Sequence, residues 1–115
     1  MDNVIEDKSF EFAVKIVKMA LELKKSNQYY ELGSQVLRSG TSIGANVAEA
    51  QSAQSKRDFV SKMNIALKEA KETEYWLKLL AASEIITQEK AGSLLGGVRE
   101  LQRILTAILK TASVR

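Results

Sequence analysis

The chain contains no cysteine, no histidine and no proline, and aromatic residues make up only 6% of its 115 residues. Without cysteine and histidine, disulfides, thiolate or imidazole metal sites and a histidine general base are excluded. The absence of proline, the strongest helix breaker, favours long helices. We therefore expect a helical protein with no metal, no cofactor and no enzymatic activity.

Long hydrophobic runs are lacking as well. No apolar run approaches the roughly 20 residues that a membrane span needs. The N-terminal segment MDNVIEDKSFEF has neither the positive flank nor the apolar run of a signal peptide. We expect a cytoplasmic protein with a single domain over residues 1–115, because a chain of this length supports one core and not two.

Apolar residues recur at helical spacing in four segments, which predicts helices at about 9–25, 28–53, 56–83 and 88–112. Ser9 is the expected N-cap of the first helix, with frayed residues before it. Ser55 followed by Asp58 resembles a capping box, and Thr87 can cap the fourth helix. Four amphipathic helices with short connections predict an all-α, antiparallel, up-down-up-down four-helix bundle.

Two helices carry more apolar surface than one partner can cover. The first helix has two apolar stripes, one starting at Phe10 and one at Phe12, and we expect a wide buried arc that includes both. On the third helix, Ile65, Trp76 and Leu79 lie off the main apolar stripe. The surface left over predicts self-association.

The segment Val36–Ala50 is rich in residues that weaken a helix, since Gly40 and Gly44 each cost about 1 kcal/mol relative to alanine. Its apolar residues nevertheless keep helical spacing. We expect Gly33, Gly40 and Gly44 to form a small-residue side that allows close packing, with the third helix as the neighbour.

The run LRSGTSIGANVAEAQSAQSKRDF, followed by KMNIALKEAKETEYWLKLL, resembles a bacterial four-helix-bundle family that includes the proteins encoded by intervening sequences in 23S ribosomal RNA genes. The resemblance spans residues 30–80. The accessory variability protein of diversity-generating retroelements is similar in fold. The resemblance implies a homopentamer shaped as a barrel, with nucleic acid as its partner.

Several positions that match the family motif are polar and lie on the second and third helices. We interpret them as a structural polar network or a subunit interface, in which Arg38 and Glu49 pair with charged residues of the third helix. The alternative is a ligand pocket, and a carboxylate metal site is disfavoured because no Glu-x-x-His pair is present. The residues of this set are Arg38, Ser39, Ser42, Asn46, Glu49, Asp58, Lys62, Glu69, Glu72 and Trp76.

Basic residues align on two helices of a chain whose net charge is only +3. On the fourth helix the cations share one side with Gly92 and Gly96, and small residues there let a backbone approach closely. On the third helix they lie opposite the apolar stripe, where cations are often simply solvated. The candidate nucleic-acid-binding residues are Arg99, Arg103 and Lys110 on the fourth helix and Arg57, Lys68, Lys71 and Lys78 on the third.

These patterns predict a non-enzymatic oligomeric bundle that binds RNA, or an RNA-protein complex, electrostatically and with weak sequence preference. The alternative is a scaffold or adaptor with a polypeptide partner, which predicts an exposed apolar patch and little dependence on salt. An enzyme is the least favoured class, because no nucleophile, base or phosphate-binding loop is recognisable.

Overall fold

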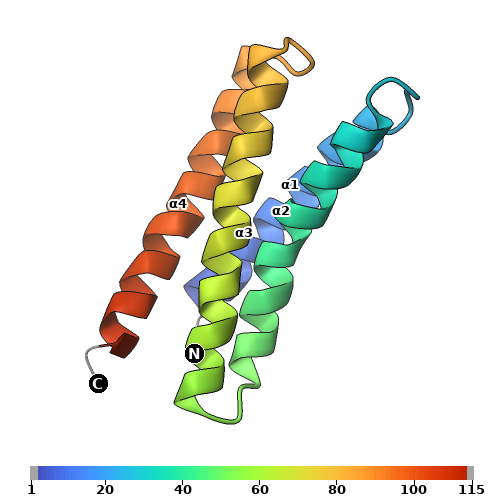
Figure 1. Ribbon diagram of the computed structural model, residues 1–115. Helices are drawn as coiled ribbons and strands as arrows, with labels where there is room; N and C mark the ends of the chain where they lie inside the picture. Colours follow the sequence, from blue (N-terminus) through green and yellow to red (C-terminus); the bar gives the residue numbers. More distant parts are fainter. Residues whose placement is uncertain (1–2, 114–115) are drawn as a thin grey trace.

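The computed structural model describes residues 3–113 and shows four α-helices in an up-down-up-down bundle (Figure 1). They are α1 (Val4–Leu23), α2 (Tyr30–Gln51), α3 (Lys56–Ala82) and α4 (Gln88–Ser113). No strand occurs within the described residues. The predicted all-α fold is therefore confirmed.

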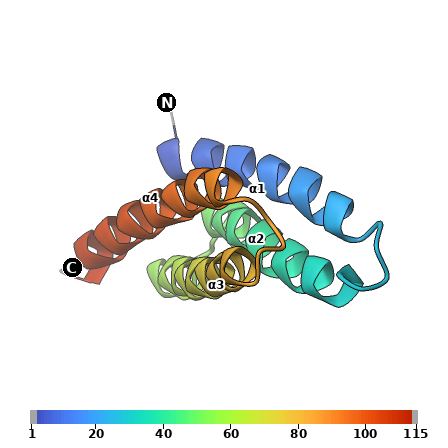
Figure 2. The same ribbon diagram turned by 90° about the horizontal axis from the view of Figure 1, so that it is seen from above.

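Each helix packs on the next one in the chain, and α4 returns to α1 over a smaller contact. The pairs α1–α3 and α2–α4 make no such contact and occupy diagonal corners of the bundle. Figure 2 shows why α1 and α4 touch so little: α4 diverges from α1 towards its own C-terminal end. In the part of the chain that is described, no helix is long and apolar enough to cross a membrane.

The first helix begins earlier than the sequence predicts, at Val4 and not at Ser9. The side chain of Asn3 supplies the cap, because its Oδ1 accepts a hydrogen bond of 3.1 Å from the amide of Glu6. Ser9 instead lies inside α1, where it is buried and donates to the carbonyl of Glu6 at 3.2 Å. The cap at Asn3, six residues before the expected one, is thus the reason for the difference.

The other two predicted caps are present. The hydroxyl oxygen of Ser55 accepts from the amide of Asp58 at 3.0 Å, and that of Thr87 accepts from the amide of Lys90 at 3.1 Å. Each satisfies one of the amides that the first turn of a helix leaves without a partner. These caps fix where α3 and α4 begin.

The glycines of α2 allow close packing, but against α1 and not against α3. A Cβ atom at Gly40 would lie 2.7 Å from Cγ2 of Ile16, and one at Gly44 would lie 3.3 Å from the carbonyl oxygen of Ser9. By contrast, a Cβ atom at Gly92 or Gly96 of α4 would meet nothing within 4 Å. The predicted small-residue side therefore exists, with a different neighbour.

The apolar stripe of α1 that starts at Phe12 faces the core throughout, whereas the stripe that starts at Phe10 is fully buried only at Ala20. Phe12, Ile16, Met19 and Leu23 are buried, whereas Phe10 is 69% exposed. The expected wide buried arc is therefore wrong for the single chain. The reason is that α1 packs only on α2 and, partly, on α4, so that no helix covers its outer side.

Candidate nucleic-acid interface

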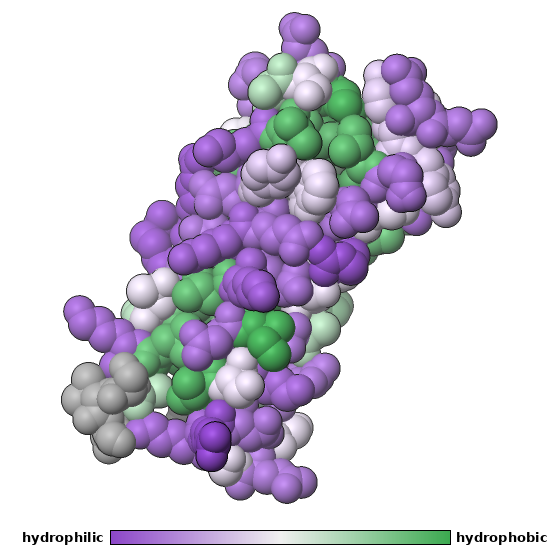
Figure 3. Space-filling view, viewed as in Figure 1, coloured by the Kyte–Doolittle hydropathy of each residue, from purple (hydrophilic) through white to green (hydrophobic). Residues whose placement is uncertain are grey.

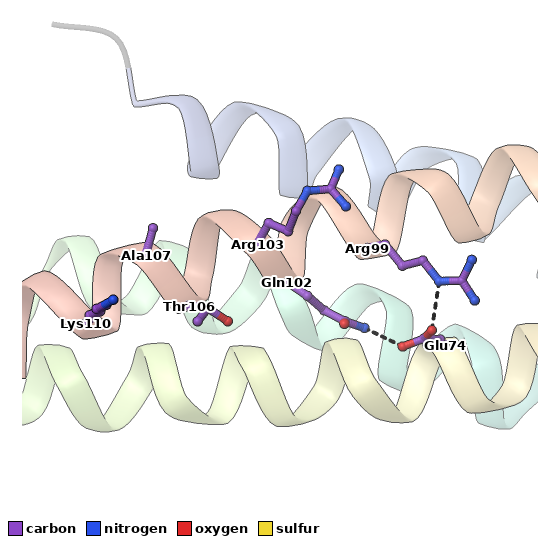
Figure 4. Close-up of a pocket in the computed structure, with 7 residues that line it drawn as sticks. All are labelled: Glu74, Arg99, Gln102, Arg103, Thr106, Ala107 and Lys110. Carbon is purple, nitrogen blue, oxygen red and sulfur yellow. Dashed lines mark hydrogen bonds and ion pairs between the residues drawn. The ribbon is translucent and has the colours of Figure 1, made fainter.

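The three predicted cations of α4 line one open groove. It has a volume of about 580 Å³, and its lining includes Arg99, Arg103 and Lys110 from α4 together with Glu74 from α3. Figure 4 shows Arg99 directed at Glu74 of α3, Arg103 directed away from it, and Lys110 at the other end of the groove. Their spacing of four and seven residues places them on one helical stripe, as the sequence indicates. We call this the basic groove.

A single carboxylate organises the Arg99 end of the basic groove. Glu74 accepts a hydrogen bond of 2.9 Å from Nε of Arg99 and another of 2.9 Å from Nε2 of Gln102 (Figure 4). The Gln102 bond first, and the Arg99 bond next, lower the pKa of Glu74 from its ordinary value, because both stabilise the carboxylate. Glu74 therefore holds two side chains of α4 in place.

Positive charge still exceeds negative charge in the basic groove. Arg99 contacts Glu74 through Nε, and its two outer nitrogens point away from the carboxylate (Figure 4). Arg103 points away from Glu74 and takes part in no ion pair among the described residues. Such a surface attracts phosphate groups, and the arginine fork matches their geometry.

The four predicted cations of α3 do not all belong to this surface. Lys78 is close enough to Glu74 for its charge to help lower the pKa of that carboxyl group. Lys71 shares the α4 side of the helical wheel with Lys78. Lys68 and Arg57 are exposed but are turned further from α4. None of the four is among the residues that line the basic groove, and only Lys78 is shown to lie near its carboxylate, Glu74.

The predicted polar network lies between α2 and α3, and its charged members pair within one chain. Arg38 forms ion pairs with Glu69, at 3.3 Å, and with Glu72. Glu72 also accepts a hydrogen bond of 3.1 Å from the indole of Trp76. At the other end Lys62 contacts Glu49 at 2.9 Å, and this hydrogen bond raises the pKa of Lys62.

The uncharged members of the set satisfy backbone or buried partners. The Ser42 hydroxyl donates to the carbonyl of Arg38, and the Asn46 amide donates to the carbonyl of Ser42. Asp58, a charged member, takes part through its backbone amide, which donates to the Ser55 cap at the start of α3. Ser39 is buried and accepts a hydrogen bond of 2.9 Å from Thr73, which sequence reasoning did not assign to this network.

These contacts favour a structural role for the polar set over a ligand pocket. Among the described residues, no buried side-chain nitrogen or oxygen lacks a hydrogen-bond partner. The described part of the chain also contains no cluster of acidic residues that could hold a metal ion. The polar set between α2 and α3 therefore has internal partners, whereas the basic groove between α3 and α4 presents charge to solvent.

Sequence reasoning missed Glu74 and Gln102 as members of the site. The sequence offers Lys78, four residues after Glu74, as its partner, since such pairs are common in helices. In the structure Glu74 faces α4 and binds Arg99 and Gln102 across the helix interface. The sequence does contain one indication that Arg99 and Gln102 act together: they are three residues apart and therefore share one side of α4.

Comparison with known proteins identifies a family and solved structures that resemble this chain. The family model described as 23S rRNA-intervening sequence protein matches residues 1–107. A crystal structure of a protein of unknown function from the S23 ribosomal protein family of Bacteroides thetaiotaomicron VPI-5482 has 50% sequence identity and a TM-score of 0.89. The match covers 92% of this chain and 98% of that one. No curated protein matches the chain significantly. The chain belongs to the 23S rRNA-intervening sequence protein family.

Proposed function

We propose that the protein is a non-enzymatic helical bundle that assembles with copies of itself and binds RNA electrostatically. The observation that carries this proposal is the basic groove, whose lining contains three cations, Arg99, Arg103 and Lys110, and one carboxylate, Glu74. Lys78 adds a further positive charge beside it. The absence of histidine and cysteine supports a role other than catalysis.

Self-assembly strengthens the electrostatic argument. Each phosphate neutralised contributes about 0.9 to the salt slope for a duplex and about 0.7 for a single strand. Two or three contacts on one copy give weak binding, but an oligomer repeats the basic groove once per copy. A long RNA can then contact several grooves together, with an effective concentration set by their spacing. The pentamer implied by the family resemblance is the assembly that we propose.

The chemistry of the groove favours positioning of the backbone over reading of bases. Its donors are arginine and lysine side chains, which match phosphate oxygens. Among the described residues, it presents no aromatic side chain on which a base could stack, since these line it: Glu74, Arg99, Gln102, Arg103, Thr106, Ala107 and Lys110. We therefore propose binding with weak sequence preference.

One observation favours the scaffold alternative, in which the partner is a polypeptide. Phe10 and Leu21 on the outer side of α1 are 69% and 53% exposed. Exposed apolar side chains of this size typically contact another protein. Binding to such a partner would depend little on salt, in contrast to binding through the basic groove.

The proposal is tested by removing charge from the basic groove. The variant Arg99→Gln/Arg103→Glu should weaken the binding of a structured RNA by about tenfold or more at low salt and reduce the slope of log K against log salt. The matched control, Lys15→Gln/Lys18→Glu on α1, changes the net charge equally at a distance from the groove. Its binding should change about twofold or less. Equal losses in both variants, or none in either, would refute the assignment.

A further inference from the structure

A second groove with several cations lies on the other side of α4, between α1 and the start of α4. It has a volume of about 690 Å³, larger than that of the basic groove. Its cations are Lys15 and Lys18 from α1 and Lys90 from α4. No residue lines both grooves. We call the second one the α1–α4 groove.

The body of α4 separates the two grooves. Figure 2 shows the start of α4 beside α1. Figure 3 shows the face on which α3 lies in front, with a hydrophilic band between two hydrophobic areas. In the same view α1 lies behind that face (Figure 1). A small ligand in the α1–α4 groove would therefore not contact the basic groove.

The three cations of the α1–α4 groove have no anionic partner within the described part of the chain. The ammonium groups of Lys15, Lys18 and Lys90 take part in no ion pair there. Of the two carboxylates in the lining, Glu22 is bound at 3.2 Å by Lys25, which lies outside the groove. Cations that line one hollow repel one another, and an anion bound between them removes this repulsion.

The charge pattern changes along the same seam. Towards the start of α1, a smaller hollow of about 160 Å³ shares Lys15 with the α1–α4 groove. There, Lys8 of α1 and Glu100 of α4 form an ion pair of 3.2 Å. A cation on that part of the seam thus has a partner on the facing helix. In the α1–α4 groove the described residues provide no such pair across the seam, so the partner must come from outside the chain.

The rest of the lining indicates a ligand larger than a single ion. Met19 and Leu94, each only 5% exposed, give the groove an apolar floor. A methionine thioether packs favourably against an aromatic ring. The exposed hydroxyl of Ser93 and the carboxylate of Glu89 are available to donate to, and accept from, hydroxyl groups. A hollow of this volume suits a small organic molecule.

We propose that the α1–α4 groove binds a small phosphorylated ligand of the nucleoside monophosphate class. Its phosphate, with a charge of about −1.5 to −2 at neutral pH, contacts Lys15 and Lys18 on one wall and Lys90 on the other. Its ring lies on the floor of Met19 and Leu94. The inference goes beyond the proposed RNA binding and does not depend on it.

Equilibrium dialysis with adenosine monophosphate tests the site, and the two charge variants of the RNA experiment serve as each other's control. Lys15→Gln/Lys18→Glu should raise the dissociation constant about tenfold or more. Arg99→Gln/Arg103→Glu removes the same charge from the basic groove and should change it about twofold or less. Lys90→Gln tests the facing wall and should also weaken binding. Equal losses in the two matched variants, or no binding to the wild type at millimolar concentration, would overturn the proposal.

Two further probes test the class of ligand. Inorganic phosphate should bind about tenfold or more weakly than adenosine monophosphate, because it cannot cover the apolar floor. Adenosine should bind as weakly, because it has no charge for the lysines. If phosphate binds as tightly as the nucleotide, the groove is a general anion site. If adenosine does, the lysines have no role. Either result would contradict the proposal.

Lysine acetylation, followed by mass spectrometry, locates the ligand without any variant. Lys15, Lys18 and Lys90 are exposed, so the reagent reaches them in the free protein. Saturating adenosine monophosphate should slow their acetylation several-fold. The exposed Lys71 and Lys78 of α3 are the internal controls and should react at an unchanged rate. The same rates with and without the nucleotide at all five lysines would refute the location.

RNA retention separates this proposal from the RNA-binding proposal. A structured RNA should be retained equally with and without a terminal phosphate, because the ligand of the α1–α4 groove is a free nucleotide. A preference for the terminal phosphate that disappears in Lys15→Gln/Lys18→Glu would assign the groove to an RNA end and overturn the free nucleotide. Loss of retention in Arg99→Gln/Arg103→Glu bears on the basic groove alone.

Discussion

Helices α2 and α4 carry the same kinds of residue in different surroundings. On α2, Gly40 packs on α1 and Arg38 is bound by two carboxylates of α3. On α4, a Cβ atom at Gly96 would meet nothing within 4 Å, and Arg103 forms no ion pair among the described residues. Gly40 and Arg38 of α2 are therefore structural, whereas Gly96 and Arg103 of α4 are open to solvent. The neighbouring helix, and not the residue type, determines the difference.

The same substitution on the two helices should have different effects, and this is the largest change that we expect. Gly40→Ala and Gly96→Ala both gain helix propensity, by about 1 kcal/mol. Only Gly40→Ala places a methyl group against the buried Ile16 side chain, and overpacking typically costs about 1 to 3 kcal/mol. The free energies of unfolding of the two variants, measured in urea, should therefore differ by about that amount. Equal stabilities would remove the contrast between the two helices.

A smaller difference is expected for two threonines. Thr73 is fully buried and donates to Ser39, whereas Thr106 is exposed in the basic groove. Thr73→Val keeps the shape and removes the hydrogen bond between α3 and α2, so it should lower the free energy of unfolding by about 1 kcal/mol. Thr106→Val should change it by about 0.5 kcal/mol or less. Thermal unfolding of the pair measures the difference, and a larger loss for Thr106→Val would contradict it.

The smallest effect concerns pH. The pKa of Glu74 in the folded protein lies below its ordinary value of 4.5. The contacts of Glu74 with Gln102 and Arg99 therefore stabilise the fold at pH values above 4.5, and this stabilisation is lost as the pH falls through the folded-state pKa. Between neutral pH and about pH 3 the wild type should therefore lose more stability than Glu74→Gln, in which this carboxylate is absent. Parallel stability curves for the two proteins would show that the Arg99 and Gln102 contacts are too exposed to matter.

The sequence predicts the fold and much of the polar set for a physical reason. Helical spacing of apolar residues marks the four helices, and local caps such as Ser55 mark where they begin. Helices adjacent in the chain also pack on each other, so Arg38 and Glu49 of α2 could be expected to meet the charges of α3, as they do. These features depend on local sequence and on chain order alone.

Other features depend on how each helix is rotated about its own axis, which periodicity does not settle. Both stripes of α1 have helical spacing, and only the packing shows that Phe12 is buried while Phe10 is exposed. Glu74 could have paired with Lys78 on its own helix, but the rotation of α3 turns it towards Arg99.

The contact between Glu74 and Arg99 also bears on the conformational entropy of binding. An arginine side chain loses up to about 2 kcal/mol of rotamer freedom when it is held in one position. Glu74 restrains Arg99 through Nε when the chain folds and leaves its outer nitrogens directed outwards. An anion that binds Arg99 does not have to restrict the rotamers of this side chain, because folding has already done so. An acidic residue in a basic surface can in this way increase its affinity for anions.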